Sequence, residues 1–251
     1  MSVSKIVILL VLLLHSVVSF RGGKSYIKYQ TVLHSKASQI SSSRNDTIID
    51  KVAIYALSLT LSSITPRPLY ALSKVGPAYS NFVSVSRLLL EYKSSDIIKE
   101  KIVSLIVAIL PGFVKDYFRQ KYSQTPKLVS ELSVKWFGFG FLQWLIGPVE
   151  AKETIISPTE TWMSTAKLTE CRFLKESGCK SACTMLCKRP TQELFRNHLG
   201  MPLYMKPNFT DNSCEMIFGV NAPQDCDDDA FKEPCFSQCG LLLSTCNTSI
   251  A

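Results

Sequence analysis

The chain has 251 residues, of which 28 are Lys or Arg and 20 are Asp or Glu, giving a net charge of +8. Six of the basic residues and none of the acidic ones fall in residues 1–45, so 22 basic residues remain against 20 acidic ones in the rest of the chain. The basic excess is therefore a property of the N-terminal segment. No basic stripe interleaved with aromatic residues remains beyond it, and we expect no nucleic-acid partner.

Residues 1–19 have the layout of a signal peptide. Lys5 precedes an unbroken apolar run, Ile6–Leu14, and the small residues Ser16 and Ser19 follow it. The run is too short to cross a bilayer as a stable helix, which takes about 20 apolar residues.

Residues 20–45 have a different composition: they are rich in serine, carry basic residues and contain no Asp or Glu. This is the composition of a transit peptide. A signal peptide followed by such a segment, with Phe20 at the junction, resembles the two-part leader of algae with secondary plastids, and it predicts delivery to a plastid (chloroplast). The alternative is a secreted protein in which residues 20–45 are a disordered linker.

Residues 46–160 contain no cysteine and show the apolar spacing of helices. Pro66 and Pro68, and later the pair Pro111 and Gly112, interrupt this pattern and separate the predicted helices. A first helix, capped by Asp46 or Thr47, is predicted to place these residues on one face: Ile49, Val52, Ala53, Ala56 and Leu57. Further helices are predicted over Tyr79–Tyr92, from about Asp96 with Ile98, Ile102, Leu105 and Ile109 on one face, and after Pro126 with Leu128, Leu132, Trp136 and Phe139 in line.

The segment Trp136–Pro148 is unusually aromatic. One interpretation is a core helix. The other is the wall of an apolar pocket, or a surface that dips into a membrane. The segment is too short to predict a transmembrane helix.

All nine cysteines lie between residues 171 and 246. This change in composition predicts a compact cysteine-rich domain over residues 161–246, either α or α+β, and with the helical region before it a mainly α fold. Spacings of four residues place side chains on one face of a helix. Two such faces are predicted: Cys179, Cys183 and Cys187 on a helix beginning near Gly178, and Cys235 and Cys239 on a second helix.

Three kinds of cysteine chemistry fit this pattern. A disulfide framework suits a secretory compartment, but nine cysteines leave one unpaired, and cysteines four apart on one helix face are poorly placed to bridge each other. A structural zinc site accepts four thiolates, but the usual close pairs, Cys-x-x-Cys, do not occur here. Iron, as an iron–sulfur cluster or a thiolate-bound ion, also suits soft thiolate ligands, but the cysteine spacing matches neither of the common ferredoxin patterns, so the type of cluster stays open.

Histidine narrows the choice of metal ligands. Of the three histidines, only His198 lies beyond residue 45. An iron site built on two or more histidines is therefore excluded within one mature chain, and His198 is predicted to end a helix. A metal would depend on thiolates.

Several separated motifs in the second half carry a family resemblance. They occur in the order FLQWLIGP (Phe141–Pro148), ECRFLKESGC (Glu170–Cys179), CTMLCKRPTQELF (Cys183–Phe195), MPLYMKPNFTDNSCEMIFG (Met201–Gly219) and KEPCFSQC (Lys232–Cys239). Together they resemble the C-terminal domain of the plant plastid β-carotene isomerase family of the strigolactone pathway.

The resemblance implies a plastid enzyme that binds iron and interconverts all-trans and 9-cis β-carotene or a related carotenoid. It also implies which cysteines are candidate metal ligands, since seven match the family pattern: Cys171, Cys179, Cys183, Cys187, Cys214, Cys235 and Cys239. Cys226 and Cys246 are additional.

Other polar residues near the cysteines are assigned no catalytic role. Arg172, Glu176, Glu193 and Asp211 are predicted to lie on helix surfaces or to cap loops, and the acidic run 227–229 is predicted to be a solvated loop. Catalytic residues are not identified.

A carotenoid isomerase needs an apolar site and access to the membrane that stores its substrate, so we expect peripheral contact with the plastid membrane. Two other functions are open: a plastid iron or iron–sulfur protein without isomerase activity, and a secreted disulfide-rich protein.

Overall fold

The structure is a computed structural model that describes residues 46–92, 94–110, 112–138 and 142–232. These residues belong to one compact unit. The predicted signal peptide (1–19), the predicted transit segment (20–45), and Cys235, Cys239 and Cys246 lie outside the described residues. Within the described ranges, no helix combines the length and the apolar character needed to cross a membrane.

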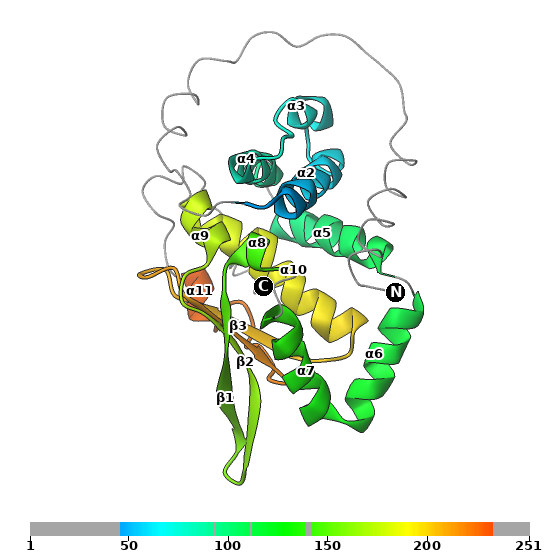
Figure 1. The fold of residues 1–251 in the computed structure, drawn as a ribbon, viewed down its shortest axis with the longest axis vertical. Coiled ribbons are helices and arrows are strands. Elements are labelled where there is room, and N and C mark those ends of the chain that lie inside the picture. The colour runs from blue at the N-terminus through cyan, green and yellow to red at the C-terminus, as the bar shows by residue number, and fades with distance from the viewer. Residues whose placement is uncertain (1–45, 93, 111, 139–141, 233–251) are drawn as a thin grey trace, which may run out of the picture. The chain divides into compact units, whose positions relative to one another are not determined.

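The first part of the unit is helical, as expected, and the helices are separated at the predicted proline positions (Figure 1). The side chains of the aromatic stretch 136–141 are outside the described set; α7 ends at Gly138 and α8 starts at Gln143. The helices are α2 (Ile48–Ser63), α3 (Pro68–Leu72), α4 (Tyr79–Leu89), α5 (Ser95–Ile109), α6 (Gly112–Gln124), α7 (Pro126–Gly138) and α8 (Gln143–Ile146).

Helix α2 begins where its sequence predicts. The Thr47 side chain accepts a hydrogen bond from the Asp50 backbone N–H, and the Asp50 carboxylate accepts one from the Thr47 N–H, which together form a capping box. The predicted inward face is wrong, however, because Ile49 is 77% exposed and Val52 is 49% exposed. The buried side carries Ile54, Ser58, Leu61 and Ser62 instead.

Of the other predicted helix faces, the one on α5 is buried as predicted at its first two positions, and the one on α7 is not. On α5, Ile98 and Ile102 are buried as predicted. On α7, Leu128 and Leu132 are half exposed, and Val129 and Val134 are buried in their place. The spacing of apolar residues predicts that a helix has an apolar face, whereas packing against neighbouring helices and strands decides which face is buried.

A four-stranded antiparallel sheet follows, in the order β1-β2-β4-β3. Residues 149–157, expected at the end of the helical region, form a strand instead. The boundary expected between residues 160 and 161 falls inside a β-hairpin, at the first residue of its second strand. Along β2 the burial alternates at first and then becomes continuous where α7 covers the strand. The strands are β1 (Val149–Ser157), β2 (Glu160–Leu168), β3 (Leu203–Pro207) and β4 (Cys214–Phe218).

The segment between β2 and β3 is helical. Gly178, with φ +54, ends the first helix in the left-handed region that favours glycine. Residues 180–198 then form one continuous helix that contains two π-helical stretches. The elements are α9 (Arg172–Ser177), η1 (Ala182–Lys188), α10 (Arg189–Glu193) and η2 (Leu194–His198), and α11 (Asp229–Lys232) follows the sheet.

One hydrophobic core joins the two regions. Phe82 of α4 packs against Phe173 of α9 with ring centroids 5.5 Å apart, and Phe195 of η2 packs against Phe218 of β4 at 5.5 Å. Buried residues from α2 through β4 belong to the same cluster. The helical region therefore forms part of the platform on which the cysteine-bearing segments are placed.

Arg172 is the main polar connection between these regions, and its expected place on a helix surface is wrong. Its side chain is 7% exposed. The guanidinium donates to both carboxylate oxygens of Asp46 at 2.6 and 2.8 Å, to Glu176 at 2.7 Å and to the Trp144 carbonyl at 2.9 Å. It also lies 3.8 Å from the ring centroid of Tyr79. The start of α2 is thereby attached to α9, α8 and α4.

We predict that Arg172→Met lowers the free energy of unfolding by about 3–5 kcal/mol, because the substitution leaves two buried carboxylates without their cation. Chemical denaturation followed by circular dichroism measures the loss. The control is Lys175→Met on the same helix, which breaks an exposed pair with Glu170 and should cost at most about 1 kcal/mol. Equal losses for the two variants would contradict the role given to Arg172.

Candidate functional site

Four of the seven candidate cysteines are free thiols in one neighbourhood, three of them buried and Cys187 partly buried. Cys171 precedes α9, Cys183 and Cys187 lie one turn apart in η1, and Cys214 begins β4. These thiols are near enough for their charges to interact: the pKa of Cys183 responds to the other three, and that of Cys214 responds to Cys171 and Cys187. Three separate segments of the chain thus converge on one buried sulfur-rich region.

Burial makes these sulfurs neutral thiols at ordinary pH. Desolvation raises the pKa of Cys183 and Cys214 well above the usual range, and it raises that of Cys171 as well. It raises the pKa of Cys187 to about 12, although a hydrogen bond from Thr191 acts in the opposite direction. A cation bound at the sulfurs would favour the thiolates and oppose this effect, because thiolates are the forms that bind metals.

Cys179 has a different environment from the one predicted. It is fully buried and disulfide-bonded, and its partner lies outside the described residues. It also lies just before the helix that starts at residue 180. Of the three cysteines predicted to share one helix face, only Cys183 and Cys187 therefore do so. In this state Cys171 and Cys214, from other segments, accompany Cys183 and Cys187. Cys226 is exposed.

Within the described ranges, no group of three or more His, Cys, Asp or Glu side chains is arranged to hold a metal ion. Two of the seven candidate ligands, Cys235 and Cys239, lie outside those ranges. Soft buried sulfurs are the donors that iron–sulfur clusters require, but the described part does not assemble a complete ligand set. The iron site therefore stays a prediction.

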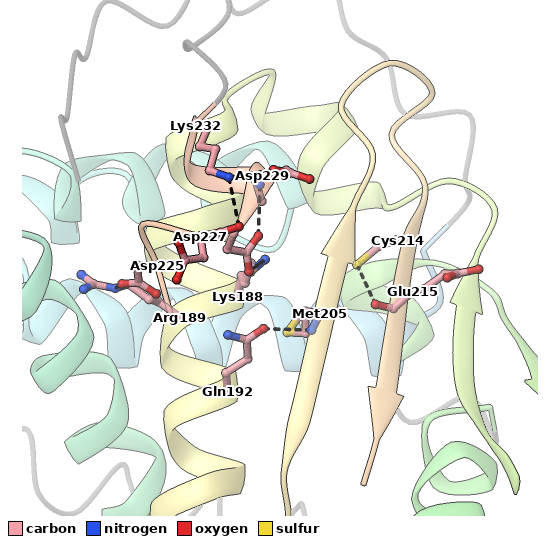
Figure 2. Close-up of polar contacts among 12 residues, drawn as sticks. Lys188, Arg189, Gln192, Met205, Cys214, Glu215, Asp225, Asp227, Asp229 and Lys232 are labelled. Carbon is pink, nitrogen blue, oxygen red and sulfur yellow. Dashed lines mark hydrogen bonds and ion pairs between the residues drawn. The ribbon is translucent and has the colours of Figure 1, made fainter. Parts of the chain in front are cut away.

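An ion pair borders the thiols on one side. Lys188 is completely buried, and its ammonium donates to Asp228 at 2.5 Å. The rings of Tyr204 and Phe231 flank the ammonium, each 5.3 Å from Nζ. Figure 2 shows Lys188 on its helix beside the acidic loop, with Cys214 on the neighbouring strand.

The prediction of a solvated acidic loop is therefore wrong for Asp228, which is 2% exposed. Its neighbours Asp227 and Asp229 are exposed, as predicted. Asp228 is buried because it is the counter-ion of Lys188, and an unpaired charge in that position would cost several kcal/mol.

Tyr79 and Arg172 border the thiols on another side. The Tyr79 hydroxyl donates to the Leu145 carbonyl at 2.5 Å, and burial raises its pKa well above the usual value. The same tyrosine responds electrostatically to Cys171 and Cys187. The region between α4, α9, η1 and β4 is thus enclosed by satisfied polar groups, and π-helical turns such as η1 are frequent at functional sites.

An apolar groove lies elsewhere on the molecule, between the start of α7 and β2. Its volume is about 570 Å³, and it is lined by Thr125, Pro126, Lys127, Leu128, Glu131, Glu160 and Trp162. Within the described residues the buried Trp162 Nε1–H has no hydrogen-bond partner, so packing alone holds this ring. Because Leu168 pairs with Cys214, the groove is roughly 20 Å along β2 from the thiols, at about 3.3 Å per residue.

The remaining polar residues have structural roles. His198 ends η2, as predicted, and its carbonyl accepts from Arg119. Asp211 accepts from the Ser213 backbone N–H at 2.8 Å and caps a loop as predicted. Glu193 accepts from Asn197 on the helix surface.

Comparison with known proteins gives one family match. Residues 144–227 match the family described as "Beta-carotene isomerase D27-like, C-terminal". This range includes the four free thiols, Arg172, Lys188 and the whole sheet. This part of the chain is similar to the C-terminal domain of the β-carotene isomerase D27-like family.

Two D27 proteins are similar over longer stretches. "Beta-carotene isomerase D27, chloroplastic" of Arabidopsis thaliana is 37% identical over 140 residues, which cover 56% of this chain and 52% of the plant protein. The protein of the same name from Medicago truncatula is 43% identical over 99 residues, 39% of each chain. The chain thus spans about half or less of the length of these relatives. No solved structure matches it significantly.

Sequence reasoning missed three features of the structure. The pairing of Lys188 with Asp228 joins residues 40 apart, and the clamp of Arg172 on Asp46 joins residues 126 apart. The groove at Trp162 depends on how α7 packs on β2. One local indication of the Lys188–Asp228 pair was present in the sequence: a lysine directly follows the Cys183–Cys187 pair in a largely apolar helix.

We predict that, in chelator-treated native protein at pH 8, Cys171, Cys183, Cys187 and Cys214 resist alkylation by iodoacetamide. The reagent attacks thiolates, and burial both blocks access and keeps these thiols protonated. Mass spectrometry of digests, compared with protein alkylated in denaturant, measures the protection. Labelling of all four in the native state at the unfolded rate would contradict the buried cluster.

Proposed function

We propose that the protein is a carotenoid cis–trans isomerase acting on all-trans/9-cis β-carotene or a related carotenoid. The observation that carries the proposal is the D27-like domain over residues 144–227, together with relatives named β-carotene isomerase. The relatives are also named chloroplastic, which with the basic, acid-free leader supports delivery to a plastid.

The residues of this chain support an apolar substrate. The groove of α7 and β2 is lined by Pro126, Leu128 and Trp162 among others, and its volume is in the range of sites that hold small organic ligands. A polyene in this groove would gain from apolar contact, without hydrogen bonds. We propose that it holds one part of the substrate.

The isomerase is tested with the full chain and all-trans or 9-cis β-carotene in detergent micelles, with isomers separated by chromatography. We expect the protein to bring both starting isomers to one common mixture. We also expect Leu128→Gln to lower kcat/KM by about tenfold, since a polar group in an apolar site weakens binding by about 1–3 kcal/mol. The matched control is Leu132→Gln, the neighbouring half-exposed leucine outside the groove lining.

An unchanged isomer ratio with every carotenoid offered would overturn the proposal. The alternative, a plastid iron protein without isomerase activity, would then be supported if the preparation contains iron.

We propose iron as the cofactor, held by thiolates drawn from Cys171, Cys179, Cys183, Cys187, Cys214, Cys235 and Cys239. The convergence of four free thiols supports a site in this region. Disulfide-bonded Cys179 is the weakest of the seven in this state. When bound, iron would supply transient polarisation or electron transfer that lowers the order of a polyene double bond.

The cofactor is tested by anaerobic purification, iron analysis and visible absorption. We expect Cys214→Ala to lose most of the iron, whereas Cys226→Ala keeps it, because Cys226 is exposed and outside the seven. A colourless, iron-free wild-type protein would overturn the iron proposal, and full iron content in Cys214→Ala would exclude Cys214.

A further inference from the structure

Helix α6 has an unusual position in this fold, because none of its residues is buried. One side is held to the protein: the ring of Phe118 meets that of Phe195 at 6.4 Å, and Arg119 donates to the carbonyls of Asn197 and His198. Phe113 is 74% exposed and Tyr117 is 62% exposed on another side. Two large aromatic side chains therefore face away from the core.

The exposed side of α6 repeats at intervals of four. Phe113, Tyr117 and Lys121 follow one another at spacings that place them in one row, and the Lys121 ammonium lies over the Tyr117 ring at 5.6 Å. Helix α7 carries a second row of the same kind, with exposed Leu128 and Leu132 followed by Lys135. Each helix presents two apolar residues and then a lysine.

The charge of this helix pair indicates what it meets. Residues 112–138 contain five basic residues and two acidic ones, whereas the whole chain beyond residue 45 has a net charge of only +2. Glu131, one of the two acids, is engaged with the Met163 backbone N–H. The α6–α7 pair thus combines exposed aromatic and aliphatic side chains with a positive charge that the rest of the chain beyond residue 45 lacks.

We propose that the α6–α7 pair docks on the surface of an anionic lipid bilayer. Exposed aromatic and aliphatic side chains enter the boundary between headgroups and acyl chains, and lysines beside them meet anionic headgroups. Leu128 belongs both to the exposed row of α7 and to the wall of the apolar groove. An apolar molecule leaving the bilayer at this face reaches the groove without crossing water, and this second step rests on the proposed function.

A second exposed apolar surface, on α2 and α3, provides a comparison. Ile49 is 77% exposed and Leu69 is 69% exposed, close to the values for Phe113 and Tyr117. The basic side chains there are partly neutralised, since Arg67 is paired with Glu91. Residues 48–74 contain three basic residues and one acidic one, so after the pairing of Arg67 this surface carries a smaller positive excess than α6–α7 and serves as the control.

The test is sedimentation of the full chain with carotenoid-free vesicles of phosphatidylcholine, with and without phosphatidylglycerol. We expect binding to the anionic vesicles and little to the neutral ones. Lys121→Gln/Lys127→Gln should weaken anionic binding by about thirtyfold, from about 1 kcal/mol per lysine near the surface. Phe113→Ser/Tyr117→Ser should weaken it by at least tenfold.

The control Ile49→Ser/Leu69→Ser should bind like wild type, and circular dichroism should show every variant folded, since all the replaced side chains are exposed. Equal binding of wild type and both α6–α7 variants, an equal loss in the α2–α3 control, or no dependence on phosphatidylglycerol would overturn the proposal. Because these vesicles contain no carotenoid, the outcome does not depend on whether the protein is an isomerase.

A second measurement connects docking to catalysis. The Phe113→Ser/Tyr117→Ser variant should isomerise carotenoid in detergent micelles at the wild-type rate and carotenoid in anionic vesicles at least tenfold more slowly. Equal slowing in both media would overturn the delivery step while leaving the isomerase proposal intact.

Discussion

The arrangement of this protein depends on one buried cation. The Arg172 guanidinium takes its counter-ions from Asp46, at the start of the first described helix, and Glu176, one turn further along α9. Taking a guanidinium out of water is costly unless its donors are satisfied, and here they are shared among a carboxylate pair, a carbonyl and the face of Tyr79. The helical region is thereby attached to the D27-like domain at the position next to Cys171, so the two regions are one folding unit.

The same low-dielectric interior determines the chemistry of the sulfur region. Four thiols from three segments lie among residues that leave almost no access to water, and their protonated forms are favoured. Lys188, a buried positive charge nearby, is already neutralised by Asp228, so it does not convert these thiols to thiolates. A bound cofactor cation would favour the thiolate forms in this region. This effect connects the buried thiols with the iron that the family resemblance implies.

Apolar chemistry is found at the other end of β2. The groove beside Trp162 lies where α7 packs on β2, and α6 packs on α7; Figure 1 shows α7 beside the β1–β2 hairpin. If the protein is the isomerase proposed above, its water-insoluble polyene has to come from a membrane, and we propose that the helix pair beside the apolar groove receives it. The separation of roughly 20 Å between groove and thiols, from a rise of about 3.3 Å per residue, suits a long substrate rather than a small one.

The sequence by itself determined the features that depend on neighbouring residues: the acid-free leader composition, the helices that begin near Thr47, Asp96 and Pro126, the breaks at proline, and the helical face shared by Cys183 and Cys187. Its separated motifs also predicted the family whose C-terminal domain matches residues 144–227. Only the tertiary structure decided which helix faces are covered, so that Ile49 and Leu132 are exposed while Ile54 and Val134 are buried. It also brought Cys171 and Cys214 to the helical pair and set Cys179 apart in a disulfide, and it buried Asp228 against Lys188. The reason is that local spacing follows from the covalent geometry of the chain, whereas burial and charge pairing depend on segments up to 126 residues away.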